Sequence, residues 1–535
     1  MSRTTKSIHL WLGDEAVAQG ALDAGLSGVY AYPGTPSTEI TEYIQKSAEA
    51  RARGVRSRWS CNEKTALEEA LGMSYAGRRA LCCMKHVGLN VAADPFMNSA
   101  ITGVHGGLVV VVADDPSMHS SQNEQDSRYF GVFSLLPFFE PSSQQEAYDR
   151  VREAFDLSEQ WAVPVLVRLT TRLAHSRADV MRHVETPRPQ NPLSFPNDPR
   201  RFILLPAIAR RNYAELLKKT AEFEAAAEHS THNVLEDGPD RSRGLVACGI
   251  AVNYVRETFG PAGCPHPLLK ITQYPAPRAA LRRLVETCRE IMVFEDGYPL
   301  IESLLRGISE GRNVRGRLDG TLPRAGELDP DNVAQALGHP VAPAATLPPE
   351  VIARPPSLCA GCSHANLYDY LNEALADQPG ARVFSDIGCY TLGALPPYEA
   401  IHSCVCMGAS ITMAKGAAEA GVHPSVAVIG DSTFTHSGLT GLLDIVEERT
   451  PVTVIISDNG TTGMTGGQDT SAAGRLDRLV LGLGVEPEHV VILEPLPAKH
   501  RENVERLRRE LAYRGPSVIV SSRECIQAMR ARKKT

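Results

Sequence analysis

Two short polar turns follow predicted strands in the last third of the chain. Apolar runs at 425–429 and 451–456 each end in such a turn. Because open parallel sheets bind ligands beyond the carboxyl ends of their strands, both turns are predicted at one ligand-binding edge. Mg²⁺ prefers oxygen ligands, and the turns offer a carboxylate, an amide oxygen and a backbone carbonyl. These would come from Asp431, Asn459 and Thr461.

The two turns resemble the signature that binds Mg²⁺ and thiamine diphosphate. That signature is a Gly-Asp-Gly turn followed roughly thirty residues later by a pair of asparagines. Here Gly430 and Asp431 match it, whereas Ser432 replaces the third glycine and Asp458 replaces the first asparagine. Gly-Asp and Asp-Asn-Gly are also common turn sequences, so two ordinary loop turns are the alternative.

Thiamine chemistry also needs a carboxylic acid placed against the aminopyrimidine ring. Such an acid belongs in an apolar, desolvated pocket, where it can share a proton. Glu63 opens a predicted helix in the first part of the chain and is the candidate. A carboxylate that only stabilises the positive end of the helix dipole is the commoner alternative.

Three cysteines are spaced for metal or redox chemistry. Cys359 and Cys362 form a Cys-x-x-Cys pair before a predicted helix, and Cys389 follows in an Asp-Ile-Gly-Cys motif. Two thiolates in one turn suit both zinc and iron–sulfur sites. From spacing alone, structural zinc, a redox dithiol and a cluster remain open.

Short apolar runs alternate with helix-length segments, which predicts an α/β fold with parallel sheets covered on both faces. The expected strands in the first block are 28–32, 79–85, 108–113 and 163–169. Proline-rich stretches separate the blocks. We expect two large doubly wound domains at 1–178 and 346–535, a linker with a charged helix at 179–243 and a smaller α/β domain at 244–345.

The composition excludes several classes of protein. The 535 residues are 43% hydrophobic and 22% charged, with a net charge of −7, which excludes a disordered chain and a basic nucleic-acid-binding surface. The longest apolar stretch is too short to span a membrane, and no signal segment precedes it. We therefore expect a cytoplasmic protein whose twelve cysteines are reduced.

Several motifs resemble a single family in colinear order. The chain is similar to the large subunit of the indolepyruvate:ferredoxin oxidoreductases, within the 2-oxoacid:ferredoxin oxidoreductase superfamily. The motifs are AYPGTPST at 31–38, NEK at 62–64, MKHVGLN at 84–90, DDPSMHSSQNEQDSR at 114–128, DIGC at 386–389 and TTGMTG at 461–466.

The resemblance implies a thiamine-diphosphate-binding fold. Residues 1–178 would be the pyrimidine-binding domain, 244–345 a transketolase-C-like domain and 346–535 the diphosphate-binding domain with the iron–sulfur cysteines. Cofactor contacts are expected from Gly430, Ser432, Met407 and Gly408.

The resemblance also implies roles around the substrate. Glu63 would be the activating acid, while Thr35 and Arg128 would lie at the substrate pocket, where a hydroxyl can bond a ketone oxygen and a guanidinium a carboxylate. Thr35 as a turn residue and Arg128 in a surface ion pair are the alternatives. His86 and His119 are candidate polar groups near the cofactor, and either could be a hydrogen-bonded core histidine.

For the cluster, the resemblance implies a fourth cysteine after a late strand. Cys525, following the apolar run at 516–520, would complete a [4Fe–4S] site with the three cysteines above. Cys404 and Cys406 are alternative fourth ligands.

The implied activity is oxidative decarboxylation of an arylpyruvate or similar 2-oxoacid to acyl-coenzyme A. Family members usually carry a ferredoxin-like extension, and ten residues after Cys525 leave no room for it. We therefore expect a smaller β/γ-type partner subunit, an external electron acceptor such as ferredoxin, and a hetero-oligomer with a dimeric core. Gly467 stands where the family usually has a histidine.

Two other functions remain open at this stage. One is a non-oxidative thiamine-dependent decarboxylase or lyase whose cysteines are structural or bind zinc. The other is a non-catalytic scaffold subunit of a redox complex, against which the presence of Glu63, Asp431 and Asn459 argues.

Overall fold

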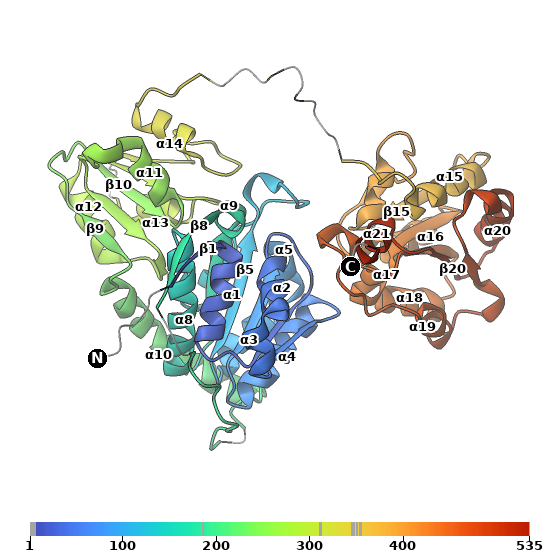
Figure 1. The fold of residues 1–535 in the computed structure, drawn as a ribbon, viewed down its shortest axis with the longest axis horizontal. Helices are drawn as coiled ribbons and strands as arrows, with labels where there is room; N and C mark the ends of the chain where they lie inside the picture. The colour runs from blue at the N-terminus through green and yellow to red at the C-terminus, as the bar shows by residue number, and fades with distance from the viewer. Residues whose placement is uncertain are drawn as a thin grey trace. The chain divides into compact units, whose positions relative to one another are not determined.

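The computed structural model describes residues 7–183, 187–198, 200–309, 313–343, 348, 351 and 356–533. The chain divides into two compact units, unit 1 over 1–345 and unit 2 over 346–535 (Figure 1). Each unit has its own sheets and hydrophobic cores. The predicted boundary between residues 345 and 346 lies outside the described residues.

The main sheet of unit 1 has seven strands in the order β12-β6-β7-β5-β4-β2-β3. All neighbouring pairs are parallel except β12 with β6. The central strands are buried along their whole length, which explains why they read as continuous apolar runs. The strands are β2 (Gly28–Ala31), β3 (Arg56–Trp59), β4 (Ala80–Lys85), β5 (Leu108–Asp114), β6 (Phe138–Phe139), β7 (Val165–Thr170) and β12 (Gln273–Tyr274).

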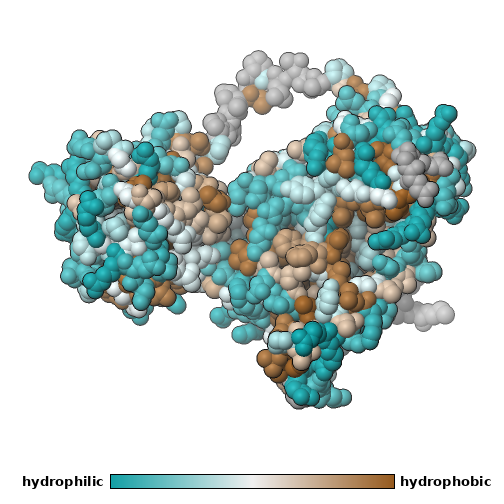
Figure 2. All heavy atoms as spheres, turned by 180° about the vertical axis from the view of Figure 1, so that it is seen from behind, coloured by the Kyte–Doolittle hydropathy of each residue, from teal (hydrophilic) through white to brown (hydrophobic). Residues whose placement is uncertain are grey.

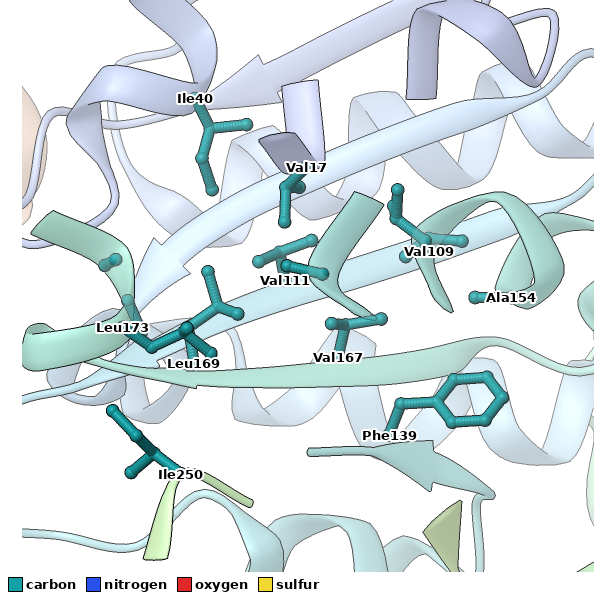
Figure 3. Packing of buried hydrophobic residues seen from close by; sticks show 14 of the residues in the cluster. Val17, Ile40, Val109, Val111, Phe139, Ala154, Val167, Leu169, Leu173 and Ile250 are labelled. Carbon is teal, nitrogen blue, oxygen red and sulfur yellow. The ribbon is translucent and has the colours of Figure 1, made fainter. Parts of the chain in front are cut away.

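Helices cover both faces of this sheet. On one face, α1 (Gly13–Asp23), α2 (Thr38–Lys46) and α8 (Gln144–Trp161) bury their apolar sides; Val17 of α1 lies near Val111 of the sheet in Figure 3. On the other face, α4 (Glu63–Tyr75) and α6 (Ala93–Thr102) pack against the opposite side chains of the same strands. The remaining helices of this part are α3 (Ala48–Ala52), α5 (His86–Val91), α7 (Arg128–Ser134) and α9 (Thr171–His175).

A second sheet of unit 1 contains five strands in the order β14-β13-β10-β11-β9. These are β9 (Val234–Glu236), β10 (Arg243–Cys248), β11 (Leu268–Ile271), β13 (Glu290–Phe294) and β14 (Asn313–Arg315). The helices of this segment are α10 (Pro206–Glu228), α11 (Ala251–Phe259), α12 (Arg278–Thr287), α13 (Leu300–Ile308) and α14 (Pro330–Leu337). β12 comes from the same segment but pairs with β6 of the main sheet, so the two sheets belong to one compact unit. A two-stranded antiparallel ribbon, β1 (Ser7–Leu12) with β8 (Arg177–Arg182), completes unit 1.

Unit 2 has one fully parallel sheet in the order β16-β15-β17-β18-β20-β19. Helices α15 (Ser363–Leu375) and α20 (His500–Ala512) pack on one face, and α16 (Ala409–Glu419), α18 (Leu439–Glu447) and α19 (Leu476–Gly482) pack on the other. The short helices α17 (Asp431–Thr433) and α21 (Ile526–Arg532) follow strands. The strands are β15 (Arg382–Ser385), β16 (Ser403–Cys404), β17 (Ser425–Gly430), β18 (Val452–Asp458), β19 (Val490–Leu493) and β20 (Ser517–Ser522).

The predicted fold class is confirmed: two doubly wound parallel sheets and a smaller α/β segment between them in sequence. Figure 2 shows apolar groups interspersed among polar residues on the surface of both units. None of the described helices is both long enough and apolar enough to cross a membrane.

Candidate active site

The predicted metal-binding turns of unit 2 lie side by side. β17 and β18 are neighbouring parallel strands in which Gly430 pairs with Ser457, so the residues that follow them emerge at the same edge. All three predicted ligands are buried: Asp431 is 2% exposed, Asn459 8% and Thr461 6%. The sheet therefore brings together the residues that the sequence suggested for Mg²⁺.

The carboxylate of Asp431 has no counterion among the described residues. Its Oδ2 atom is buried and has no hydrogen-bond partner among the described residues. Burial and the nearby charge of Asp458 raise the pKa of Asp431 to about 7, although backbone N–H groups oppose that shift. A divalent cation would remove this penalty because it supplies the missing positive charge. This buried, unpartnered oxygen fits a magnesium ligand.

Asn459 is held in place by its neighbours. Its Oδ1 accepts a hydrogen bond from the Thr461 backbone N–H at 3.0 Å, which leaves one of the two lone pairs on that oxygen available. Its Nδ2 lies 3.3 Å from Nε2 of His364, whose Nδ1 lies 2.6 Å from the Ser457 hydroxyl. Burial lowers the pKa of His364 to about 4, so this imidazole is neutral.

His364 was not among the residues predicted from the sequence. It lies two residues after Cys362 on α15, and its contact with Asn459 depends on the packing of α15 against the sheet. The motif after Cys362 gives no local sign of that contact. It acts as a positioning residue for Asn459.

The loop after Asn459 folds back onto the Asp431 turn. The Thr461 hydroxyl donates to the Gln468 carbonyl at 2.9 Å, and the Thr462 N–H donates to the same carbonyl at 2.9 Å. The Thr462 hydroxyl lies 3.0 Å from the Ser432 hydroxyl, so Ser432 joins the two turns. Gly467 has φ +92°, a conformation that favours glycine over the histidine usual in the resembled family.

Glycines near the turns leave space for bulky neighbours. A Cβ at Gly430 would lie 2.5 Å from the Tyr390 ring, and a Cβ at Gly408 would lie 2.6 Å from Ser437 Cβ. Gly408 also has φ +87° at the start of α16, with half-buried Met407 before it. Both glycines are therefore required by close packing at this edge of the sheet.

Asp386 fixes the start of α16. It is fully buried, accepts a hydrogen bond from the Ser410 hydroxyl at 2.6 Å and is bonded by the Tyr390 hydroxyl. Burial raises its pKa to about 6. Because Tyr390 also packs against Gly430, Asp386 connects the Asp-Ile-Gly-Cys motif to the Asp431 turn.

Cys525, one of the four predicted cluster ligands, lies beside Asn459. The Cys525 backbone N–H donates to the Asn459 carbonyl at 2.9 Å, and Gln527 donates to Cys359 Sγ at 3.4 Å. Burial raises the pKa of Cys389 to about 11, and the neighbouring thiols of Cys362, Cys525 and Cys359 add to that shift. Cys359 and Cys525 thus both raise the pKa of Cys362 as well as that of Cys389.

Cys404 and Cys406 belong to a different environment. Both are exposed. Burial raises the pKa of the Cys404 thiol, and the charges of Asp386 and Cys406 add to that shift. The four predicted cluster ligands are not among the influences on Cys404. Cys525, by contrast, is among the groups that raise the pKa of Cys389.

In unit 1, Glu63 is the first residue of α4 and is 4% exposed. Asn62 caps this helix by accepting from the Thr65 N–H at 2.8 Å. A Cβ at Gly88 would lie 2.6 Å from Glu63 Oε1, so the backbone of α5 lies directly against the carboxyl group. The carboxyl group of Glu63 is therefore enclosed against the backbone of α5.

Lys85 lies at the end of β4 near Glu63 and was not predicted as a site residue. It is 9% exposed, and its Nζ donates to the Ser120 carbonyl at 3.0 Å. Burial lowers its pKa to about 8, although Asp115 and Glu63 oppose the shift. A lysine that ends an otherwise apolar strand was the available signal in the sequence.

Thr35 lies beside the same loop. The Ser120 hydroxyl donates to the Thr35 carbonyl at 3.4 Å, and the Thr35 side chain is only partly buried. Ser120 thus connects Thr35 with Lys85 at the carboxyl edge of the main sheet.

The two candidate histidines differ. His86 is 1% exposed, its Nε2 lies 3.1 Å from the Asn123 carbonyl, and burial lowers its pKa. Its Nδ1 is buried without a hydrogen-bond partner among the described residues. His119 is 49% exposed and pairs with Glu327 at 3.3 Å. Only His86 is thus enclosed in the protein.

Arg128 belongs to a buried network of ion pairs. It is fully buried, and its guanidinium donates to Asp126 at 2.6 Å, to Glu295 at 2.9 Å and to the Tyr298 carbonyl at 2.7 Å. Its guanidinium nitrogens thus bind groups within unit 1, and its place at the substrate pocket stays a prediction. The contact with Glu295 comes from residues far away in sequence, which is why the motif alone did not reveal it.

Comparisons with known proteins agree with this arrangement. Residues 19–229 match the family described as pyruvate flavodoxin/ferredoxin oxidoreductase, thiamine diP-binding. Residues 386–520 match the family described as thiamine pyrophosphate enzyme, C-terminal TPP binding domain. The first match contains Thr35, Glu63 and Lys85, and the second contains Asp431 and Asn459.

Curated relatives extend the likeness to nearly the whole chain. It is 37% identical to indolepyruvate oxidoreductase subunit IorA from Archaeoglobus fulgidus, covering 98% of this chain and 87% of that protein. It is 36% identical to the protein of the same name from Pyrococcus abyssi, covering 96% and 85%. A 2-oxoglutarate synthase subunit KorA from Methanothermobacter thermautotrophicus is 30% identical over 31% of this chain and 46% of its own.

A solved structure has a similar fold. It is the 2-oxoglutarate:ferredoxin oxidoreductase from Magnetococcus marinus with 2-oxoglutarate, coenzyme A and succinyl-CoA bound. Its TM-score is 0.52 at 16% identity, covering 63% of this chain and 66% of that chain. The chain belongs to the family of indolepyruvate oxidoreductase large subunits, which are thiamine-diphosphate-dependent 2-oxoacid oxidoreductases.

Proposed function

We propose that this chain is the catalytic subunit for oxidative decarboxylation of an arylpyruvate-type 2-oxoacid to its acyl-coenzyme A ester, with electrons leaving through a [4Fe–4S] cluster. The observation that carries the proposal is the arrangement in unit 2. Asp431, whose buried Oδ2 has no hydrogen-bond partner among the described residues, follows β17, and Asn459 follows the neighbouring strand β18. The Asn459 carbonyl accepts a hydrogen bond from the Cys525 backbone N–H. A metal–diphosphate site and a cysteine group would thus share one edge of a sheet.

Thiamine diphosphate, when bound, supplies a nucleophilic carbon and an electron sink for decarboxylation of the 2-oxoacid. The carboxyl group of Glu63 would supply the proton needed at the aminopyrimidine ring. Its position against Gly88 limits the access of water to the carboxyl group. Lys85 adds positive charge beside this acid and the Thr35 loop, so it is placed to orient a substrate carboxylate together with the predicted Arg128.

Asp431, Asn459 and the Thr461 carbonyl would hold Mg²⁺, which in turn holds the diphosphate. Ser432 and Thr462 keep the two turns together, and His364 keeps the Asn459 side chain in place. These residues orient oxygen ligands and move no proton.

Cys359, Cys362, Cys389 and Cys525 would bind the cluster as thiolates. Burial raises the pKa of Cys362 and Cys389, and the neighbouring thiols add to both shifts, so these two cysteines must lose their protons against that shift when iron binds. Cluster assembly compensates for that repulsion because iron neutralises the thiolate charge.

The relatives are named as subunits, and the similar solved enzyme is named for ferredoxin and coenzyme A. We infer that this chain likewise works with a smaller subunit and passes electrons to ferredoxin or another redox protein. The hetero-oligomer would contain a dimeric core.

The test uses the full chain purified without oxygen. We expect about four irons per chain, visible absorbance typical of a [4Fe–4S] centre, and bleaching of that absorbance when thiamine diphosphate, Mg²⁺ and indolepyruvate are added. Glu63→Gln should keep the iron and lose the bleaching. Cys525→Ser should lower the iron content, whereas Cys406→Ser should not.

Other outcomes would overturn the proposal. Zinc at the cysteines with an aldehyde as product would indicate a non-oxidative decarboxylase. Bound cofactor without turnover in the presence of the partner subunit would indicate a scaffold. Full activity in Glu63→Gln would show that another group activates the cofactor.

A further inference from the structure

A second cluster of ligand-type side chains lies in unit 1, where α1, α2 and α9 meet. It consists of Asp14, Glu39 and His175, which come from three separate helices. One ligand atom of each residue lies within 4.8 Å of the ligand atoms of the other two. His175 Nε2 is 3.4 Å from Glu39 Oε2. The proposed cofactor and cluster ligands include none of these residues.

Asp14 is the residue whose environment is incomplete. It is fully buried, and neither carboxylate oxygen has a hydrogen-bond donor among the described residues. Burial raises its pKa well above the ordinary value, and the charges of Glu39 and Glu15 add to the shift. Two carboxylates this close are stable only if a proton or a cation lies between them. The imidazole of His175 lies beside them and would be a third ligand for a cation. A proton shared between the two carboxylates would not need this imidazole.

The backbone is shaped to bring these helices together. A Cβ at Gly13 would lie 2.2 Å from the Leu173 carbonyl oxygen and 3.1 Å from Ala174 Cα. Only glycine lets α9 approach the start of α1 so closely. This contact places His175, the last residue of α9, beside Asp14, the second residue of α1.

The cluster is open to solvent on one side. A cavity of about 300 Å³ is lined by Glu39, Glu42 and Tyr43, together with Glu15, Lys46 and Ser47. The side chains of Glu39 and His175 are 38% and 33% exposed, whereas that of Asp14 is buried. An ion could therefore enter from the cavity and keep a water ligand there.

We propose that Asp14, Glu39 and His175 bind a divalent transition-metal ion of the Zn²⁺ class. An imidazole with two carboxylates suits Zn²⁺, whereas Mg²⁺ and Ca²⁺ prefer oxygen ligands alone. Three protein ligands leave the fourth tetrahedral position for water. The ion would link three helices that otherwise meet through two facing carboxylates.

The link would stabilise the loop before α2. Thr35 lies in that loop and Glu39 in the first turn of the helix that follows it. Since only the folded unit brings the three ligands together, bound Zn²⁺ should raise the melting temperature of the protein.

The experiment measures Zn²⁺ bound to the full chain at equilibrium, in competition with a zinc-specific indicator dye. Wild type is compared with Asp14→Asn, His175→Gln and the matched control Glu42→Gln, which removes a carboxylate from the same cavity but outside the cluster. Any zinc held by the cysteines is common to all four proteins. We expect Asp14→Asn and His175→Gln to bind one equivalent less than wild type, and Glu42→Gln to bind the same amount.

Melting temperature gives an independent measurement. Zn²⁺ should raise it in wild type and Glu42→Gln by more than in His175→Gln. Equal zinc binding in all four proteins would overturn the proposal. The proposal would also be overturned if Asp14→Asn bound as much zinc as wild type and, in the presence of a chelator, melted at a higher temperature than wild type. That result indicates a proton shared between Asp14 and Glu39. If Asp14→Asn does not fold, His175→Gln alone decides, since its position near the surface tolerates the change.

Discussion

The Arg128 network of unit 1 and the Asp431 turn of unit 2 bury charge in opposite ways. Arg128 and Arg168 are fully buried with Asp114, Asp126 and Glu295, and each guanidinium has carboxylate partners at hydrogen-bond distance. Asp431 is also buried, but the charge that raises its pKa is that of another carboxylate, Asp458, and its Oδ2 has no partner among the described residues. Loss of one partner from a buried ion pair destabilises the folded protein, whereas an unpaired buried carboxylate indicates a position where a ligand supplies the missing charge.

The largest effect should come from breaking the paired network. Arg128→Met leaves Asp126 and Glu295 buried without their cation, and we expect unit 1 to lose about 3–5 kcal/mol of stability. Calorimetric unfolding measures this loss. The control is Arg188→Met, which removes an ion pair with Asp156 whose side chains are 51% and 59% exposed and should cost at most about 1 kcal/mol. Equal effects of the two changes would contradict the structural role of Arg128.

The same kind of change at the unpaired site should affect binding and not folding. Asp431→Asn removes a charge that the folded protein does not compensate, so the melting temperature without cofactor should stay the same or rise. Binding of thiamine diphosphate with Mg²⁺ should weaken roughly 100-fold, because a metal ligand is lost. Isothermal titration calorimetry measures that affinity. Unchanged affinity would show that the metal is held elsewhere.

The pH dependence sharpens the contrast further. The pKa of Asp431 is raised from 3.8 to about 7, so between these values the folded protein binds a proton that the unfolded chain releases. Stability of metal-free unit 2 should therefore fall as pH rises through this window. Mg²⁺ must displace that proton, so its affinity should rise up to about tenfold per pH unit below pH 7 and level off above it.

This dependence can be tested by titrating magnesium at several pH values from about 5.5 to about 8. The concentration of thiamine diphosphate is kept fixed, on the order of its dissociation constant. Asp431→Asn should show a flat profile over the same range. A flat profile in wild type would mean that Asp431 is ionised without the metal.

The smallest effect is expected at Ser432. Ser432→Gly restores the Gly-Asp-Gly pattern of the signature but removes the contact between the Ser432 and Thr462 hydroxyls. We expect a loss of about 0.5–1.5 kcal/mol in stability of the turn, with a change of less than about tenfold in cofactor affinity. Differential scanning fluorimetry and the same calorimetric titration measure the two quantities. A loss as large as that of Asp431→Asn would make Ser432 a direct ligand.

Local patterns predicted those parts of the molecule whose cause is local. Continuous apolar runs identified the buried strands β4, β5, β17 and β18, because a strand covered on both faces needs apolar residues throughout. The turns carrying Asp431 and Asn459 follow directly from two such strands, so their adjacency could be predicted as well.

Features that depend on distant packing could not be predicted in this way. Arg128 has the residue type that binds a carboxylate, and the motif does not reveal that Glu295 supplies one. His364 and Lys85 gain their roles from burial and from contacts with Ser457 and Ser120 in other segments. The type of each residue indicated the chemistry that its side chain can perform, whereas tertiary packing determines which group that side chain contacts.

The pairing of β12 with β6 has a consequence for how the chain folds during synthesis. β6 lies at residues 138–139 and its antiparallel partner at 273–274, so the edge of the main sheet is completed only after the second segment has been synthesised. Until then β6 has an unpaired edge, and strand edges of this kind favour association with other chains. A nascent or truncated chain that ends before residue 273 should therefore be prone to aggregation, even though every other strand of that sheet is already present.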